Sequence, residues 1–233
     1  MLHLPSPWRV PEIIIRRRKV LATRFSVNEP IAALTFDDGP DPASTPLVLD
    51  LLKTYRVRAT FFMLGKSAQR YPDLLKRVAA EGHVVGNHSW NHTSFATMAG
   101  RERRAQLRRC QEALSPYGRR IFRPPWGKHT TASLWDAYCL RYRVILWDVD
   151  VDDWCDRDSD RMAGRLLDET RPGSIILLHD AVFNNTGNGK GPAPCLDRTP
   201  MLLALEMFLE QAPARFRFVT IPEMFDLGRP MND

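Results

Sequence analysis

The sequence Ile-Ala-Ala-Leu-Thr-Phe-Asp-Asp-Gly-Pro at residues 31–40 joins a mostly apolar run to a pair of carboxylates. The run over 31–36 has the length and composition of a strand that is buried on both faces of a sheet. Asp37 and Asp38 follow it directly, and the Gly-Pro pair after them is typical of a polar turn. We therefore expect a buried strand that presents both carboxylates at its carboxyl end.

Similar runs recur along the chain and alternate with segments of helical periodicity. We predict strands over residues 31–36, 57–64, 83–85, 121–122, 142–147, 174–178 and 216–219. We predict helices over residues 45–55, 68–80, 101–114, 132–140, 160–170 and 200–211. Strands that alternate with helices indicate βα units and a parallel sheet. Their number favours an α/β fold with a small or incomplete barrel over a sandwich.

Composition and charge narrow the class of protein. The 233 residues are 44% hydrophobic and 26% charged, as in ordinary globular domains, and no apolar run approaches the ~20 residues of a membrane-spanning segment. The formal net charge of +6 suits nucleic acid, an anionic membrane surface or an anionic substrate. No RNA-binding signature or zinc-finger spacing is present, so we expect no nucleic-acid partner. The basic set over 101–109 has the spacing of a solvated helix face.

Cysteine usage and the start of the chain bear on the compartment. The cysteines at positions 110, 139, 155 and 195 form no Cys-x-x-Cys pair, so we expect reduced thiols. Residues 1–30 contain several prolines and no apolar run of signal-peptide length. As written, the chain is expected in the cytoplasm, with the cell envelope or secretion by another route as the alternative. No feature of the sequence specifies the oligomeric state.

Reactive side chains gather just after the predicted strands. They are Asp37 and Asp38 after 31–36, His88 and His92 after 83–85, Arg123 after 121–122, Asp148 and Asp150 after 142–147, and His179 and Asp180 after 174–178. In parallel barrels the carboxyl ends of the strands share one face, and active sites lie there. The pattern therefore predicts an enzyme with its active site at this face.

Two histidines point to a metal site. His88 and His92 are four residues apart, the spacing that puts two imidazoles on one face of a helical turn. A carboxylate from Asp37 or Asp38 completes a His₂Asp set that leaves positions open for water and substrate. Zn²⁺ is the expected ion, with Co²⁺ or Ni²⁺ as alternatives. The other carboxylate is then a candidate general base and His179 a candidate acid, although singly these residues also suit a polar turn and a core histidine.

Five short motifs follow one another in a recognisable order. They are Thr35-Phe36-Asp37-Asp38-Gly39-Pro40, His88-Ser89-Trp90-Asn91-His92, Arg123-Pro124-Pro125-Trp126-Gly127, Asp150-Val151-Asp152-Asp153-Trp154 and Leu177-Leu178-His179-Asp180. The set resembles that of the polysaccharide deacetylases with a NodB-type domain, carbohydrate esterase family 4. Trp126 departs from the family, where tyrosine or phenylalanine is commoner. The resemblance implies a single domain with a distorted, incomplete (β/α)7 TIM-like barrel.

The resemblance also implies a role for each matching residue. The catalytic residues would be Asp37 as base, His179 as acid, Arg123 orienting Asp37, and Asp153 holding His179. The metal ligands would be Asp38, His88 and His92. The oxyanion and substrate-binding residues would be Pro125, Trp126, Trp154 and Leu177. The implied reaction is hydrolysis of an N-acetyl group on an amino sugar of a chitooligosaccharide- or peptidoglycan-like glycan.

The resemblance divides the chain and leaves two alternatives for its function. Residues 31–228 would form the catalytic domain, with 1–30 as an extension packed on the outside and 229–233 as a tail. The Gly/Asn/Pro-rich stretch 184–194 is expected to be a long loop at the rim. The alternatives are a deacylase of a small amide or acetyl ester, and a non-catalytic glycan-binding relative.

Overall fold

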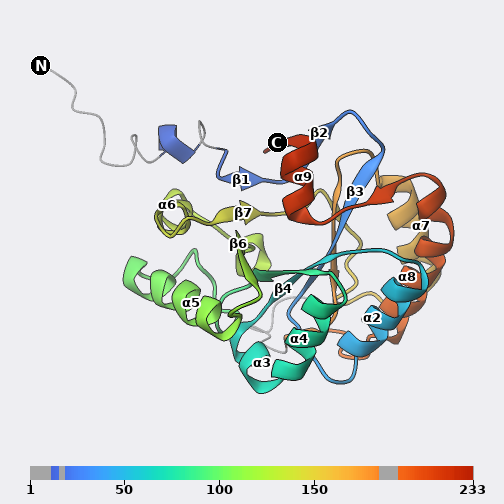
Figure 1. The fold of residues 1–233 in the computed structure, drawn as a ribbon, viewed down its shortest axis with the longest axis horizontal. Coiled ribbons are helices and arrows are strands. Elements are labelled where there is room, and N and C mark those ends of the chain that lie inside the picture. Colours follow the sequence, from blue (N-terminus) through green and yellow to red (C-terminus); the bar gives the residue numbers. More distant parts are fainter. Residues whose placement is uncertain (1–11, 16–18, 184–193, 233) are drawn as a thin grey trace, which may run out of the picture.

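A curved parallel sheet forms the centre of the computed structural model, which describes residues 12–15, 19–183 and 194–232 (Figure 1). Neighbouring strands follow the order β1-β7-β6-β5-β4-β3-β9-β8, with β10 beside β3. Every one of these pairs is parallel. The order does not return to its first strand within the described residues, so the barrel is incomplete. The predicted α/β fold with a distorted, incomplete barrel is confirmed.

Each predicted strand has a counterpart in this sheet. The sheet contains β1 (Leu21–Ala22), β3 (Ile31–Asp37), β4 (Thr60–Met63), β5 (Val84–Asn87), β6 (Gly118–Phe122), β7 (Arg143–Ile145), β8 (Val149–Asp150), β9 (Ile175–His179) and β10 (Arg217–Phe218). β1 and β8 were not predicted. They are two residues long, too short to show any periodicity in the sequence.

Helices cover the outside of the sheet (Figure 1). They are α2 (Thr45–Thr54), α3 (Gly65–Arg70), α4 (Pro72–Ala80), α5 (Gly100–Ala113), α6 (Thr131–Cys139), α7 (Ser159–Glu169), α8 (Thr199–Gln211) and α9 (Ile221–Leu227). The single helix predicted over 68–80 is wrong, because the chain breaks at Tyr71 and α4 begins at Pro72. Proline lacks an N–H and disfavours helical dihedrals at the residue before it. None of the described helices has the length and apolarity needed to cross a membrane.

Both ends of the described chain pair with the rest of the molecule. β1 adds to the edge of the main sheet beside β7, so part of the predicted outer extension belongs to the barrel. β2 (Arg24–Val27) and β11 (Gly228–Met231) form a separate antiparallel pair. Phe25 N–H donates to Gly173 O at 2.9 Å, which ties this pair to the amino-terminal end of β9. The predicted loop over 184–194 lies, apart from Pro194, outside the described residues.

Burial on both faces of β3 fixes the direction of the reactive side chains. All seven residues of this strand are buried. Ile31 and Ala33 join the inner cluster, whereas Leu34 and Phe36 pack outward with the helix side chains. Because side chains alternate along a strand, Asp37 falls on the inner face, at the carboxyl end of the barrel.

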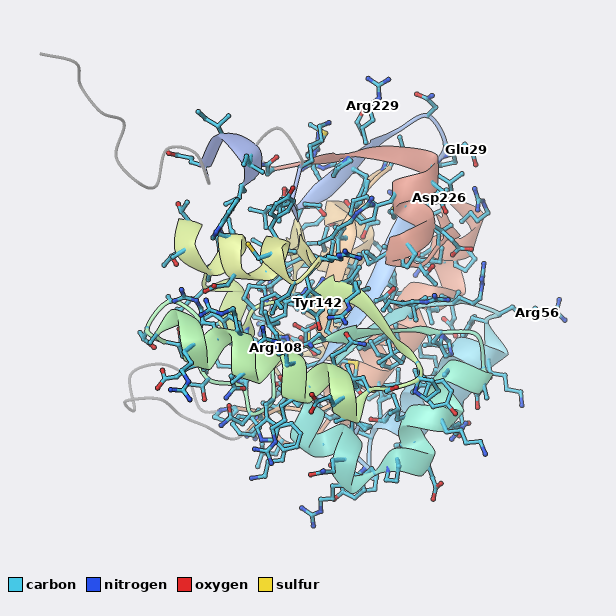
Figure 2. The ribbon with its side chains drawn as sticks, turned by 60° about the vertical axis from the view of Figure 1, so that its left-hand side comes forward. Glu29, Arg56, Arg108, Tyr142, Asp226 and Arg229 are labelled. Carbon is cyan, nitrogen blue, oxygen red and sulfur yellow. The ribbon has the colours of Figure 1, made fainter. Side chains whose placement is uncertain are left out.

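The predicted solvated face of α5 is wrong at one position. Arg108 and Arg109 are exposed, and Figure 2 labels Arg108 on this helix. Arg103 is buried instead, and its guanidinium bonds the carboxylate of Asp136 in α6 at 2.7 Å. A buried carboxylate requires a cationic partner, so this arginine joins α5 to α6.

Candidate active site

The carboxyl ends of β3 and β9 bring the reactive residues together. Asp37 and His179 occupy paired positions in these neighbouring strands. His88 and Arg123 follow β5 and β6, whose ends are joined by a 3.0 Å bond from Arg123 N–H to Asn87 O. The candidate residues from four strands thus meet at one edge of the barrel, as the sequence predicts.

Asp38, His88 and His92 form the one group of possible metal ligands found among the described residues. Asp38 Oδ1 lies 3.4 Å from His88 Nε2 and 3.3 Å from His92 Nε2. This oxygen is buried and has no hydrogen-bond partner in the described part of the chain. A buried, unpaired carboxylate oxygen is costly, and a divalent cation between these three atoms removes that cost. The nitrogen and oxygen donors suit Zn²⁺.

The electrostatics of this set also suit a cation. Burial raises the pKa of Asp38, but His92 and His88 outweigh it, so the pKa lies below its usual range and the group is a carboxylate. Burial lowers the pKa of His92 to about 4, so its imidazole is neutral near pH 7. Metal ligands require these protonation states.

The histidines lie in a loop, so the predicted helical turn is wrong. Ser89 and His92 have φ values of 73° and 58°. Asn87 Oδ1 accepts the Ser89 N–H at 2.9 Å, and Ser89 Oγ accepts the His92 N–H at 3.0 Å. Such side-chain bonds give the backbone an alternative to helix. His88 Nδ1 lies 2.8 Å from Arg123 O, and donation to this carbonyl leaves Nε2 unprotonated toward the site.

Arg123 holds the Asp37 carboxylate. Its Nη1 donates to Asp37 Oδ1 and to Thr35 Oγ1, each at 2.8 Å. Its other donors bond the carbonyls of Ile145 at 3.2 Å and Leu146 at 3.0 Å. Arg123 is fully buried, so these bonds fix the guanidinium and, with it, one oxygen of Asp37. The second oxygen lies 3.7 Å from His88 Nε2, beside the metal ligands.

His179 pairs with Asp153. Its Nδ1 lies 2.8 Å from Asp153 Oδ1, and its backbone N–H donates to Asp153 Oδ2 at 2.9 Å. Burial lowers the pKa of His179, but the Asp153 charge and hydrogen bond outweigh it and raise the pKa to about 9. The imidazole is therefore protonated at neutral pH. Asp148 was also predicted at this face, and this prediction is wrong, because Asp148 accepts the Ile175 N–H at 2.7 Å at the opposite end of β9.

The predicted substrate-binding residues lie around this centre. Pro125 is buried and begins a short turn in which Trp126 has a φ of 55°. The Trp126 side chain is 44% exposed, and its ring centroid lies 4.3 Å from that of His92. Leu177 is buried on the inner face of β9, two residues before His179. Trp154 follows Asp153 and is half-buried.

Phe183 and Arg198 contact this centre and were missed in the sequence, whereas Asp180 beside them was predicted at this face. The Phe183 N–H donates to Asp38 Oδ2 at 2.9 Å. Asp180 is buried against Thr45 Oγ1, and burial raises its pKa to about 7. Arg198 contacts Asp153 and His179. Arg198 lies 45 residues from Asp153 along the chain, and no motif links the two positions.

Comparisons with known proteins agree with this geometry. The family model described as polysaccharide deacetylase matches residues 25–145. A peptidoglycan-N-acetylglucosamine deacetylase of Bacillus cereus is 36% identical over 206 residues, which cover 87% of this chain and 70% of that protein. A chitooligosaccharide deacetylase of Azorhizobium caulinodans is 37% identical over 163 residues, covering 68% of this chain and 78% of that protein.

A solved structure extends the similarity to the fold. The crystal structure of the Bc1960 peptidoglycan N-acetylglucosamine deacetylase superposes with a TM-score of 0.81 at 33% sequence identity. The match covers 94% of this chain and 98% of that chain. With the family model and the curated relatives, it confirms the family predicted from the five motifs: the chain belongs to the polysaccharide deacetylases of carbohydrate esterase family 4.

Proposed function

We propose that this chain removes N-acetyl groups from amino-sugar residues of a poly- or oligosaccharide, releasing acetate and a free amine. The observation that carries the proposal is the position of a carboxylate–arginine pair and an imidazole–carboxylate pair beside one Asp-His-His set. Hydrolysis of an amide needs a base for water, a cation for the carbonyl oxygen and an acid for nitrogen. Asp37, a metal held by Asp38, His88 and His92, and His179 would supply these three.

Asp38, His88 and His92 are the proposed metal ligands, and Zn²⁺ is the proposed ion, with Co²⁺ and Ni²⁺ as alternatives. A bound divalent ion polarises the acetyl carbonyl and makes water acidic enough to lose a proton near neutral pH. The chain fixes the geometry of the set through the bond between His88 Nδ1 and Arg123 O. Elemental analysis of the metal bound to the purified chain, compared with the metal free in the buffer, identifies the ion.

Asp37 is the proposed general base. The bond from Arg123 to Oδ1 leaves Oδ2 directed toward the metal ligands, where it would take a proton from a water molecule. Arg123 thereby fixes the position of the Asp37 carboxylate beside the metal ligands. As the water oxygen adds to the carbonyl carbon, its proton passes to Oδ2.

His179 is the proposed general acid. It is protonated at Nε2 as well as Nδ1 below its pKa of about 9, while Asp153 occupies the Nδ1 side. Nε2 is therefore free to give its proton to the sugar nitrogen as the carbon–nitrogen bond breaks. An amine that leaves without a proton is a very poor leaving group, so this transfer is essential.

The remaining predicted residues are proposed to shape the acyl pocket. The backbone N–H of Trp126 would share the negative charge on the carbonyl oxygen, an effect worth roughly 3 kcal/mol for one donor. Leu177 and Trp154 would surround the acetyl methyl group. The exposed Trp126 ring gives the substrate an aromatic surface beside His92.

The relatives bear on the substrate and the compartment. One is named for peptidoglycan N-acetylglucosamine and the other for chitooligosaccharide. We propose a β-linked N-acetylglucosamine glycan as substrate and, for a peptidoglycan substrate, the cell envelope as the place of action. Fractionation of the source cells with immunodetection tests this against the cytoplasmic alternative.

Acetate release across a panel of substrates tests the proposed function. The panel holds N-acetylglucosamine oligomers, peptidoglycan fragments, small acetamides and acetyl esters, each with metal-loaded and metal-stripped enzyme. We expect metal-dependent release from a glycan. Release from small esters or acetamides alone would favour the small-molecule deacylase, and glycan binding without release would favour the non-catalytic relative.

A further inference from the structure

Arg198 is a buried arginine that lies outside the five motifs. It precedes α8, and only 4% of its surface is exposed. A buried guanidinium is costly unless its donors are paired. The partners of Arg198 therefore show what the residue does in the fold.

Each part of the guanidinium has a partner in the candidate active site or beside it. Nη1 donates to Asp153 O at 2.9 Å and to Cys195 O at 3.0 Å. Nε donates to His179 O at 3.2 Å, and Nη2 donates to Asp153 Oδ2. Arg198 thus joins the loop after β8, the end of β9 and the chain before α8.

These contacts complete the surroundings of the Asp153 carboxylate. Oδ1 faces His179 Nδ1, while Oδ2 accepts from the His179 backbone and from Arg198. Asp153 is fully buried. Bonds to both oxygens from different directions prevent the carboxylate from rotating away from the imidazole.

We propose that Arg198 is a positioning residue for the deacetylation reaction, fixing the Asp153 carboxylate and, through it, the orientation of the His179 imidazole. This inference rests on the proposed function, because His179 matters as an acid only if the chain cleaves an acyl–nitrogen bond. Arg198 contacts only the backbone oxygen of His179 and none of the metal ligands. It is therefore assigned a positioning role and no direct part in catalysis.

The charges around His179 explain why a fixed position of the Asp153 carboxylate is useful. The imidazole faces Asp153, but the carboxylates of Asp37, Asp38 and Asp150 also lie close enough to attract it. Because Arg198 holds the Asp153 carboxylate in place, Asp153 is the fixed partner of the imidazole among these four acidic residues. Arginine suits this task, because its planar fork bonds several oxygens in fixed directions, whereas lysine offers a single point charge.

Steady-state kinetics of three variants test the inference on the glycan that wild type deacetylates. We expect Arg198→Gln to lower kcat about 10- to 100-fold with little change in KM, the usual cost of losing an outer-shell partner. Arg198→Lys keeps the charge and should give an intermediate kcat. The matched control is Arg103→Gln, which breaks a buried Arg–Asp pair between α5 and α6 that includes no residue of the candidate active site, and it should lower stability while sparing kcat.

A double-mutant cycle separates positioning from general damage. If Arg198 acts through Asp153, Arg198→Gln should cost nothing further in the Asp153→Asn background. Multiplicative losses in the double variant, or wild-type kcat in both Arg198 variants, would overturn the proposal. If Arg198→Gln does not fold, Arg198→Lys decides the question. A lower kcat in Arg198→Lys, at the unfolding temperature of wild type, would then support the positioning role.

A proton resonance supplies a readout that needs no activity. The His179 Nδ1 proton, held against Asp153, should give a downfield signal that exchanges slowly with water. We expect Arg198→Gln to broaden or remove this signal and Arg103→Gln to retain it. Retention in Arg198→Gln would contradict the inference. If wild type releases no acetate, the proposed function fails, and this measurement still shows whether Arg198 holds the pair.

Discussion

At the residue scale, the adjacent carboxylates of Asp37 and Asp38 have different partners. Asp37 bonds Arg123, whereas Asp38 faces two imidazoles and carries an unpaired oxygen. The alternation of side chains along β3 puts Asp37 on the inner face, and the φ of 77° at Asp38 turns the next side chain toward the histidines. Neighbours in sequence thus acquire separate chemical roles.

Asp37→Asn tests that separation. The amide oxygen can still accept from Arg123, but it cannot take a proton from water. We expect kcat to fall by about 10²–10⁴-fold, while the bound metal per chain is unchanged by elemental analysis. Equal activity in the variant would remove Asp37 as the base, and loss of the metal would show that it is a ligand instead.

His179 sets the expected pH dependence. Its raised pKa keeps the acid protonated below pH about 9, so kcat should decline as the pH rises through that value. Asp153→Asn removes the charge that raises the pKa, so the basic limb should move down toward the ordinary value of 6.5. The kcat–pH profiles of both proteins, recorded with saturating metal, measure this. If the basic limb of the Asp153→Asn profile stays at the wild-type pH, a group other than His179 is responsible for it.

The sequence reveals those site residues that stand directly after a strand or inside a motif, such as Asp37, His88 and His179. It does not reveal Arg198, because the partners of a buried arginine depend on how distant segments pack. It also misplaces His88 and His92 on a helical turn, because the spacing of four residues ignores the side-chain bonds of Asn87 and Ser89.

At the scale of elements, a glycine before β9 holds the strand against the antiparallel pair. Gly173 has a φ of 87°, and a Cβ there would lie 1.8 Å from Phe25 O. Gly173→Ala should lower the free energy of unfolding by more than about 1 kcal/mol, since the left-handed conformation alone costs that much. Gly164 in α7 has nothing within 4 Å of its Cβ position.

Urea unfolding of the two variants measures the effect. Gly164→Ala is the control and should raise stability by about 0.5–1 kcal/mol, because alanine favours helix. A Gly173→Ala midpoint at or above that of wild type would contradict the close approach of β2 to the start of β9.

The core strands β3, β4 and β9 were predictable because their apolar runs are continuous. β1, β2, β8 and β11 were not, because each depends on a partner far along the chain rather than on its own composition. The break between α3 and α4 follows from Pro72, a signal that helical periodicity alone overlooks.

At the scale of the whole molecule, the metal set joins loops after β3 and β5. Binding of a divalent ion should therefore stabilise the native barrel, by about 2.7 kcal/mol at a free concentration of 100 times Kd. Chelation should lower the unfolding temperature, and added Zn²⁺ should restore it. His92→Ala is the control, in which added metal should have little effect. A chelation-insensitive unfolding temperature in wild type would speak against a metal in this set.

If this barrel edge hydrolyses an amide bond on an amino sugar, acetate and a free amine must form together. Both products can be quantified from an N-acetylglucosamine oligomer treated with metal-loaded wild type. We expect equal amounts of the two, and we expect both to be lost on metal removal and in Asp37→Asn at equal metal content. Release of acetate without new amine, or equal release by Asp37→Asn and wild type, would contradict amide hydrolysis by this site.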